Sequence, residues 1–190
     1  MGGAPANARL TAVVGAILLV LLAAEGATIP WIGPLLTPHV FLGLLLIPPV
    51  ALKMASTGWR FLRYYRHDPA YVELGPPHAF MRFLVAPVTV LTTFTLFGTG
   101  ILLVVEHPHG GAILGLHKVS FVVWFGAMSL HVLGHLRSLW PEIAVSVPGR
   151  ALVAALVAVA IAAGVAFAML ELPAAHAWSH WHEMRHAFDK

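Results

Sequence analysis

The stretch LHKVSFVVWFGAMSLHVLGHL, residues 116–136, decides the predicted fold. It is apolar enough to cross a membrane, yet it carries His117, His131 and His135. On an α-helix, residues fourteen apart such as His117 and His131 fall within about 40° of the same face and about 21 Å apart along the axis. Ionisable side chains inside a membrane span are costly and normally face the interior of a helix bundle. The stretch therefore predicts a membrane helix with stacked ligand positions on its inward face.

Composition agrees with a membrane protein. The chain has 190 residues, of which 59% are hydrophobic and 10% are charged. A water-soluble domain cannot hide that much apolar surface, so we expect an all-α, integral membrane helical bundle. Cysteine is absent, which excludes disulfides, cysteine-ligated iron–sulfur clusters and covalently attached c-type haem. No basic run with interleaved aromatic residues is present, so nucleic acid is not an expected partner.

Hydrophobic runs predict five transmembrane helices in a single membrane domain over residues 1–190, with membrane lipid as the surrounding partner. The predicted spans are approximately 10–29, 39–57, 83–105, 117–139 and 151–170. The run from Leu10 to Ala24 also fits a secretory signal, with small residues near Ala27 as a cleavage site. A retained first span is the favoured interpretation.

Prolines and polar residues mark the expected helix boundaries. Thr37-Pro38 predicts the N-cap and the first residue of the second helix, and Pro48-Pro49 predicts a kink within it. The segment Trp59–Arg82 is the longest predicted polar loop, and the fourth span is expected to end before Pro141. The fifth span has no ionisable residue, which favours a peripheral packing helix that holds no cofactor.

The distribution of Lys and Arg predicts the orientation, because cytoplasmic loops carry an excess of both. One side of the membrane receives most of the arginines, namely Arg9, Arg60, Arg63, Arg66, Arg82, Arg137 and Arg150. The other side receives Lys118, Arg185 and Lys190. We therefore expect a multi-pass protein of the cell (inner) membrane with a cytoplasmic N-terminus and an outer C-terminus.

This topology pairs the histidines near the outer side. His39 and His117 each open a span that runs from outside to inside, so they could face each other and clamp one iron. Neutral imidazoles make good axial ligands when their second nitrogen is held by a neighbouring group. Helix bundles commonly build cofactor sites from side chains on facing helices.

The inner side has a less complete set of ligands. His131 and His135 lie there on the fourth span, but Lys53 stands on the second span where a matching histidine is expected. Lys53 could be an unusual amine ligand, could pair with a haem propionate, or could snorkel to the interface. His78, just before the third span, is the other candidate ligand on that side.

Two further groups of residues could surround a cofactor. Four arginines at the inner side could hold haem propionates: Arg60, Arg63, Arg82 and Arg137. The excess of positive charge in cytoplasmic loops also explains these arginines without a cofactor. The third span carries small and hydroxylated residues that allow a backbone or a flat cofactor to come close, and simple helix packing explains each glycine equally well. These residues are Thr89, Thr92, Thr93, Thr95, Gly98 and Gly100.

With His117 and His131 on one span and His39 on another, the first four spans resemble the di-haem four-helix core of membrane b-type cytochromes. That group includes the cytochrome b of quinol–cytochrome c oxidoreductases and small bacterial b-type cytochromes. The resemblance covers about residues 10–140 and implies haem b, electron transfer across the membrane and often quinone exchange. Lys53 departs from the pattern, so the resemblance implies two haems or one.

The C-terminal tail, residues 171–190, is rich in histidine. His176 and His180 are four residues apart, as are His182 and His186, so on a helix each pair would share a face and could bind a transition metal. An amphipathic helix at the membrane interface is the favoured interpretation. An outer-side redox protein or subunit could also dock there.

The sequence leaves several functions open. The favoured one is an electron-transfer cytochrome, a subunit of an oxidoreductase rather than a stand-alone enzyme, that connects a quinone pool with an outer-side redox partner. A self-contained, haem-dependent, quinol-linked reductase is one alternative. A non-redox metal transporter or metal-binding protein is another, with an entry site at His39, His107, His109 and His117. A purely structural membrane subunit is a further alternative, but it does not explain why His117, His131 and His135 share one face of the fourth span.

Overall fold

The computed structural model is all-α, and five of its helices are long and apolar enough to cross a membrane. The chain is therefore a multi-pass membrane protein, as its composition predicts. The candidate spans are Ala4–Trp31, Leu36–Tyr65, Met81–Glu106, Ala112–His135 and Val153–Leu170. The structure describes residues 3–73, 75, 79–106, 111–144, 151, 153–163, 165–166 and 168–170, without the side chains of residues 136–144.

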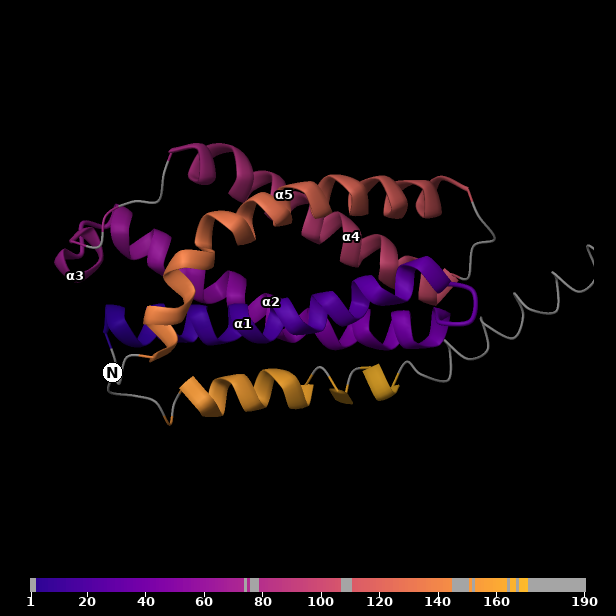
Figure 1. The fold of residues 1–190 in the computed structure, drawn as a ribbon, viewed down its shortest axis with the longest axis horizontal. Helices are drawn as coiled ribbons and strands as arrows, with labels where there is room; N and C mark the ends of the chain where they lie inside the picture. The colour runs from indigo at the N-terminus through magenta and orange to yellow at the C-terminus, as the bar shows by residue number, and fades with distance from the viewer. Residues whose placement is uncertain are drawn as a thin grey trace, which may run out of the picture.

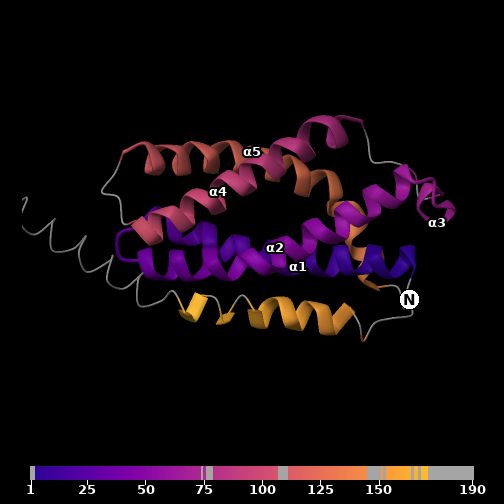
Figure 2. The ribbon, with the colours of Figure 1, turned by 180° about the vertical axis from the view of Figure 1, so that it is seen from behind.

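Four of these helices form two antiparallel hairpins. The first consists of α1 (Ala4–Thr28) and α2 (Leu36–Tyr65), and the second of α4 (Ala86–Glu106) and α5 (Ala112–Ala144) (Figure 1). The hairpins contact each other through α2 with α4 and through α1 with α5. The segment Val153–Leu170 lies on the opposite side of α1 and α2 from the second hairpin (Figures 1 and 2). The result is a four-helix bundle with a fifth helix outside it.

The first hairpin has a regular register. Gly15 faces Lys53, and Gly43 faces Glu25. Within each pair, the two residues are about equally far along the chain from the turn at Gly33. Both ends of the hairpin thus place a charged side chain of one helix against a glycine of the other. We call the end with Glu25 the turn end of the bundle and the end with Lys53 the arginine-rich end, since Arg60 and other arginines follow it.

Two apolar clusters join the fifth helix to this hairpin. One contains Leu10, Val14, Leu18, Leu46 and Val153. The other contains Val40, Leu44, Leu45, Val104 and Ala168. Because lipid is as apolar as these side chains, close packing rather than exclusion of water holds such helices together. Large apolar side chains elsewhere are exposed, among them Phe94, Val122, Phe125 and Leu133, as expected of surfaces that contact lipid.

The helices run further than the apolar runs predict. The residues Trp59–Tyr65 form the last turns of α2, so the prediction of a polar loop that begins at Trp59 is wrong. The prediction that the fourth helix ends before Pro141 is also wrong, because α5 continues to Ala144. Hydropathy reports the preference of a segment for lipid, whereas a helix can continue through polar and aromatic residues into the interface.

The start of α2 also differs from the prediction. Its N-cap is Leu35, which makes no side-chain capping hydrogen bond, and Thr37-Pro38 lies inside the first turn. Proline fits there because the first N–H groups of a helix have no partner within the helix. Further along, α2 remains helical through Pro48-Pro49.

A short helix, α3 (Pro69–Val72), and a π-helical turn, Met81–Val85, connect the two hairpins. Asp68 caps α3, because its side chain accepts the N–H of Ala70 at 3.1 Å. Asp68 also forms an ion pair with Arg63 of α2. These contacts attach α3 to the arginine-rich end of the first hairpin.

Candidate functional site

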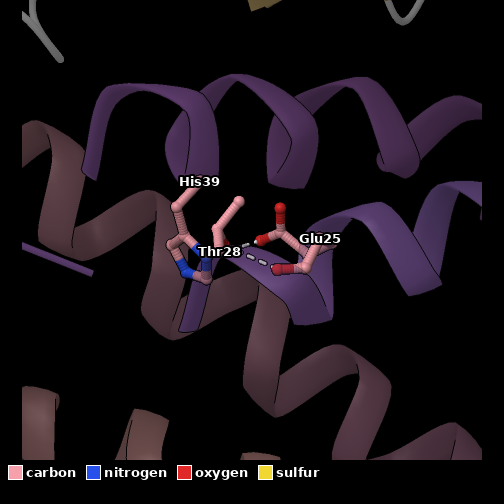
Figure 3. A network of polar contacts seen from close by, with 3 residues as sticks. All are labelled: Glu25, Thr28 and His39. Atoms are coloured by element: carbon pink, nitrogen blue, oxygen red, sulfur yellow. Dashed lines mark hydrogen bonds and ion pairs between the residues drawn. The ribbon is translucent and has the colours of Figure 1, made fainter. Parts of the chain in front are cut away.

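His39 is held by α1 at the turn end of the bundle. Its Nδ1 lies 2.9 Å from the Thr28 hydroxyl and 2.9 Å from Oε1 of Glu25 (Figure 3). The Thr28 hydroxyl donates its single proton to the Glu25 main-chain carbonyl at 2.6 Å, so it accepts the contact from His39. A carboxylate oxygen likewise accepts. Nδ1 of His39 is therefore protonated, and in the neutral imidazole this leaves the lone pair on Nε2.

His117 is held in the same way by α4. Its Nδ1 lies 2.9 Å from the Thr99 hydroxyl. That hydroxyl donates to the main-chain carbonyl of Thr95 at 2.7 Å, with Leu96 as a second acceptor at 3.1 Å. Thr99 has no second proton to donate, so it accepts the Nδ1 proton of His117. His117 is consequently in the same tautomer as His39, with its lone pair on Nε2.

The two imidazoles form a matched pair across the two hairpins. They lie close enough for the charge of one to act on the other. Each has its Nδ1 fixed by a threonine of the neighbouring helix in its own hairpin. A histidine that ligates a metal through Nε2 usually donates its other N–H to such an acceptor, which fixes the tautomer and the ring orientation. His39 and His117 thus each have the Nδ1 contact that is typical of a histidine that ligates a metal through Nε2.

Gly100 leaves the space beside His117. A Cβ atom at Gly100 would lie 3.4 Å from Cε1 of the imidazole, which is tighter than most side-chain contacts. At Gly98, by contrast, a Cβ atom would meet nothing within 4 Å. Of the two glycines that the sequence marks in this helix, Gly100 is the one next to a candidate ligand.

His131 and His135 lie near the arginine-rich end. Their rings are stacked, with centroids 4.6 Å apart and planes inclined by 28°. Nδ1 of His135 donates to the main-chain carbonyl of His131 at 2.9 Å, which leaves the lone pair of His135 on Nε2. The charges of His135 and Lys53 both act on His131, so α2 and α5 bring a lysine and two histidines to the same region.

The Lys53 ammonium points across the first hairpin. Its Nζ donates to the main-chain carbonyl of Thr11 at 2.5 Å and lies beside Gly15. Ser56 extends this polar layer, because its hydroxyl donates to the Lys53 carbonyl and contacts the Thr11 hydroxyl at 2.9 Å. Asn7 donates to the Ser56 carbonyl at 3.1 Å. The layer joins α1 to α2 inside an otherwise apolar interface.

Other residues singled out by the sequence have packing contacts. Thr93 accepts a hydrogen bond from Nε1 of Trp124 at 2.9 Å, which links α4 to α5 in the buried interior. Thr92 and Thr95 donate to carbonyls of their own helix. The Arg82 guanidinium lies 4.4 Å from the centre of the Phe83 ring.

Several predicted residues lie outside the described part of the chain. They are His78, His107 and His109, the side chain of Arg137, and the tail histidines His176, His180, His182 and His186. Within the described part, no three His, Asp or Glu side chains converge as a metal site. A bis-imidazole haem needs only two protein ligands, and the tail histidines lie outside the described residues, so both predicted sites stay predictions.

Sequence reasoning missed the three residues that hold the imidazoles: Glu25, Thr28 and Thr99. The available signal was the antiparallel register of each hairpin. Thr28 and His39 lie about equally far from the first turn, and Thr99 and His117 lie about equally far from the connection that precedes Gly111. Pairing residues across a short turn would have placed each threonine opposite its histidine.

Comparison with known protein families, with curated proteins and with solved structures finds no match to this chain.

Proposed function

We propose that this protein is a membrane b-type cytochrome in which His39 and His117 hold a haem b between the two hairpins. The observation that carries the proposal is the shared tautomer of the two imidazoles. Each is fixed through Nδ1 by a threonine and presents the lone pair of Nε2. Haem b, when bound by two histidines, supplies one-electron redox chemistry rather than oxygen binding.

The protein's own contribution is to orient the ligands. Thr28 and Thr99 each give their proton to the backbone and so remain fixed acceptors. Both His–Thr contacts are partly buried and join helices that are long and apolar enough to cross a membrane. A ligand held in this way loses little freedom on binding iron.

A second group of residues, His131, His135 and Lys53, lies near the arginine-rich end, and we assign it a role in electron exchange. If the chain binds about two haems, His131 is the expected ligand of the second. If it binds one, the three residues are better assigned to a quinone or proton site. In either form, electrons pass between a quinone pool at one face and a redox partner at the other.

The orientation belongs to the same proposal. Arg9 begins the first span, and Arg60, Arg63 and Arg66 lie at the end of the second, so the arginine-rich end gathers positive charge. By the positive-inside rule this end is cytoplasmic, and the haem of His39 and His117 lies near the outer face of the cell membrane. Reporter fusions that follow Glu73 and Glu106 should therefore report opposite sides.

The first test is a reduced-minus-oxidised visible spectrum of the purified protein with haem quantified per chain. His39→Ala and His117→Ala should each remove a b-type haem, because a single remaining axial ligand cannot hold the low-spin form. His67→Asn is the matched control: His67 is exposed and has φ 57°, a conformation that asparagine tolerates. Full haem content in the His117 variant, or no haem in the wild type, would contradict the proposal.

A further inference from the structure

The two imidazoles differ in one respect. Both contact a threonine hydroxyl, but only His39 also contacts a carboxylate, Oε1 of Glu25 at 2.9 Å. Glu25 belongs to α1 and is mostly buried, with 15% of its side chain exposed. Its Oε2 is buried without a hydrogen-bond partner among the described residues. A carboxylate is costly at such a position, so its contact with His39 calls for a physical explanation.

Gly43 and Thr28 lie beside the contact between Glu25 and His39. Gly43 lies one helical turn beyond His39, and a Cβ atom there would sit 3.5 Å from Oε1 of Glu25. That distance is an ordinary van der Waals contact. Thr28, one turn beyond Glu25 on α1, also contacts Nδ1 of His39 at 2.9 Å (Figure 3). The sequence E-x-x-T on α1 thus forms a two-acceptor cradle for one imidazole.

The chemical consequence follows from the strength of the acceptor. A carboxylate oxygen accepts a hydrogen bond about twice as strongly as a neutral oxygen. A stronger acceptor at Nδ1 increases the basicity of Nε2, and a more basic ligand favours ferric over ferrous iron. The negative charge near the iron acts in the same direction.

We propose that Glu25 is a positioning residue that sets the midpoint potential of the haem by strengthening His39 as a ligand. The inference rests on the proposed haem and adds that its two axial ligands are unequal. His39, which shares its proton with Glu25 and Thr28, is the stronger donor, and His117, held by Thr99, is the weaker.

The experiment is a redox titration of the purified full-length protein, wild type against Glu25→Gln. The isosteric amide keeps an oxygen acceptor and removes the carboxylate. We expect unchanged haem content and a more positive midpoint potential for the component that His117→Ala eliminates. A tenfold change in the preference for ferric iron corresponds to about 59 mV for a one-electron couple. Thr99→Val, the control on the other ligand, removes only a neutral acceptor and should shift the potential less.

The outcomes separate this inference from the proposed function. Absence of haem in the wild type contradicts both the proposed function and the role of Glu25. Haem that depends on His39 and His117, with the same potential in Glu25→Gln as in the wild type, overturns the role of Glu25 alone. If Glu25→Gln does not fold, Thr28→Val serves instead, because it leaves the carboxylate as the sole acceptor of the Nδ1 proton. The midpoint potential of the Thr28→Val variant should equal that of the wild type or be lower. A rise in the midpoint potential as large as that of Thr99→Val overturns the inference.

Discussion

The hydroxyl of Thr99 on α4 accepts the Nδ1 proton of His117 on α5 at 2.9 Å, and it does so because its own proton is already donated to the backbone of α4. Thr28 has the same relation to His39 in the other hairpin. Each hairpin therefore carries a histidine whose Nδ1 is fixed by a threonine of the neighbouring helix. In the proposed function, these two histidines are the ligands of the haem.

Thr99→Val should weaken the haem without unfolding the protein. Valine matches threonine in shape but cannot accept the Nδ1 proton, so the imidazole loses its fixed tautomer. Loss of such an orienting partner typically lowers the affinity for a metal about tenfold to a hundredfold. Haem retention after dilution or competition with apo-myoglobin measures this change.

The control for this substitution is Thr95→Val in the same helix. Thr95 is half-buried, and its hydroxyl donates to the Leu91 carbonyl of its own helix at 3.0 Å. It should leave haem retention at the wild-type level. Equal loss of haem in both variants would indicate a general effect on α4 and would argue against Thr99 as the orienting residue.

Gly100→Ala should displace the His117 ring, whereas Gly98→Ala should not. The new methyl group at position 100 would stand 3.4 Å from Cε1, so the imidazole has to give way by a few tenths of an ångström. The expected result is a changed electron paramagnetic resonance spectrum of the ferric haem and weaker retention. A Gly100→Ala variant identical to the wild type would show that the imidazole has room to move.

Lys53→Met should destabilise the first hairpin but leave the haem of His39 and His117 in place. The substitution removes the hydrogen bond from Nζ to the Thr11 carbonyl, and bonds of this kind between membrane helices contribute about 0.6 kcal/mol on average. Unfolding in mixed micelles measures the loss. Haem quantification in the same variant reports whether Lys53 also supports a second haem.

Lys118→Met is the matched control, because Lys118 is exposed and lies in a membrane-spanning segment of α5. It should change the unfolding free energy less than Lys53→Met does. If Lys53→Met is as stable as the wild type, the polar layer formed with Thr11 and Ser56 does not hold the hairpin together.

Trp124 and Thr93 should be energetically coupled. Trp124 is 9% exposed, and its Nε1 donates to the Thr93 hydroxyl, which makes this contact a buried link between α4 and α5. In a double-mutant cycle of Trp124→Phe and Thr93→Val, we expect a coupling of about 0.6 kcal/mol and at most about 1.7 kcal/mol. The cycle cancels the change in packing volume that each single substitution introduces.

The same cycle with Thr95 in place of Thr93 should be additive, since the Thr95 hydroxyl donates to a carbonyl of its own helix. Coupling of similar size in both cycles would mean that the two substitutions interact through a shift of α4 as a whole. Zero coupling in the first cycle would show that the hydrogen bond from Trp124 to Thr93 does not stabilise the fold.

Composition and hydropathy were sufficient for the all-α fold with five membrane-spanning helices, because these quantities report directly on how a segment partitions into lipid. They were insufficient for helix ends such as Tyr65 and Ala144, where the helix continues into residues that do not favour lipid. From the alternating direction of the spans, the sequence also predicted that His39 and His117 pair as ligands, and this stays a prediction.

Only the tertiary structure decided what holds each imidazole and where Lys53 points. Glu25 and Thr28 meet His39 because α1 is rotated to present them to α2, and Thr99 meets His117 for the same reason in the other hairpin. That rotation depends on the packing of whole helices, including the contacts of the Lys53 side chain with Gly15 and of the Glu25 side chain with Gly43. Hydropathy is a local property of a segment, whereas a hydrogen bond between helices depends on their register and rotation, which are set by all of their contacts together.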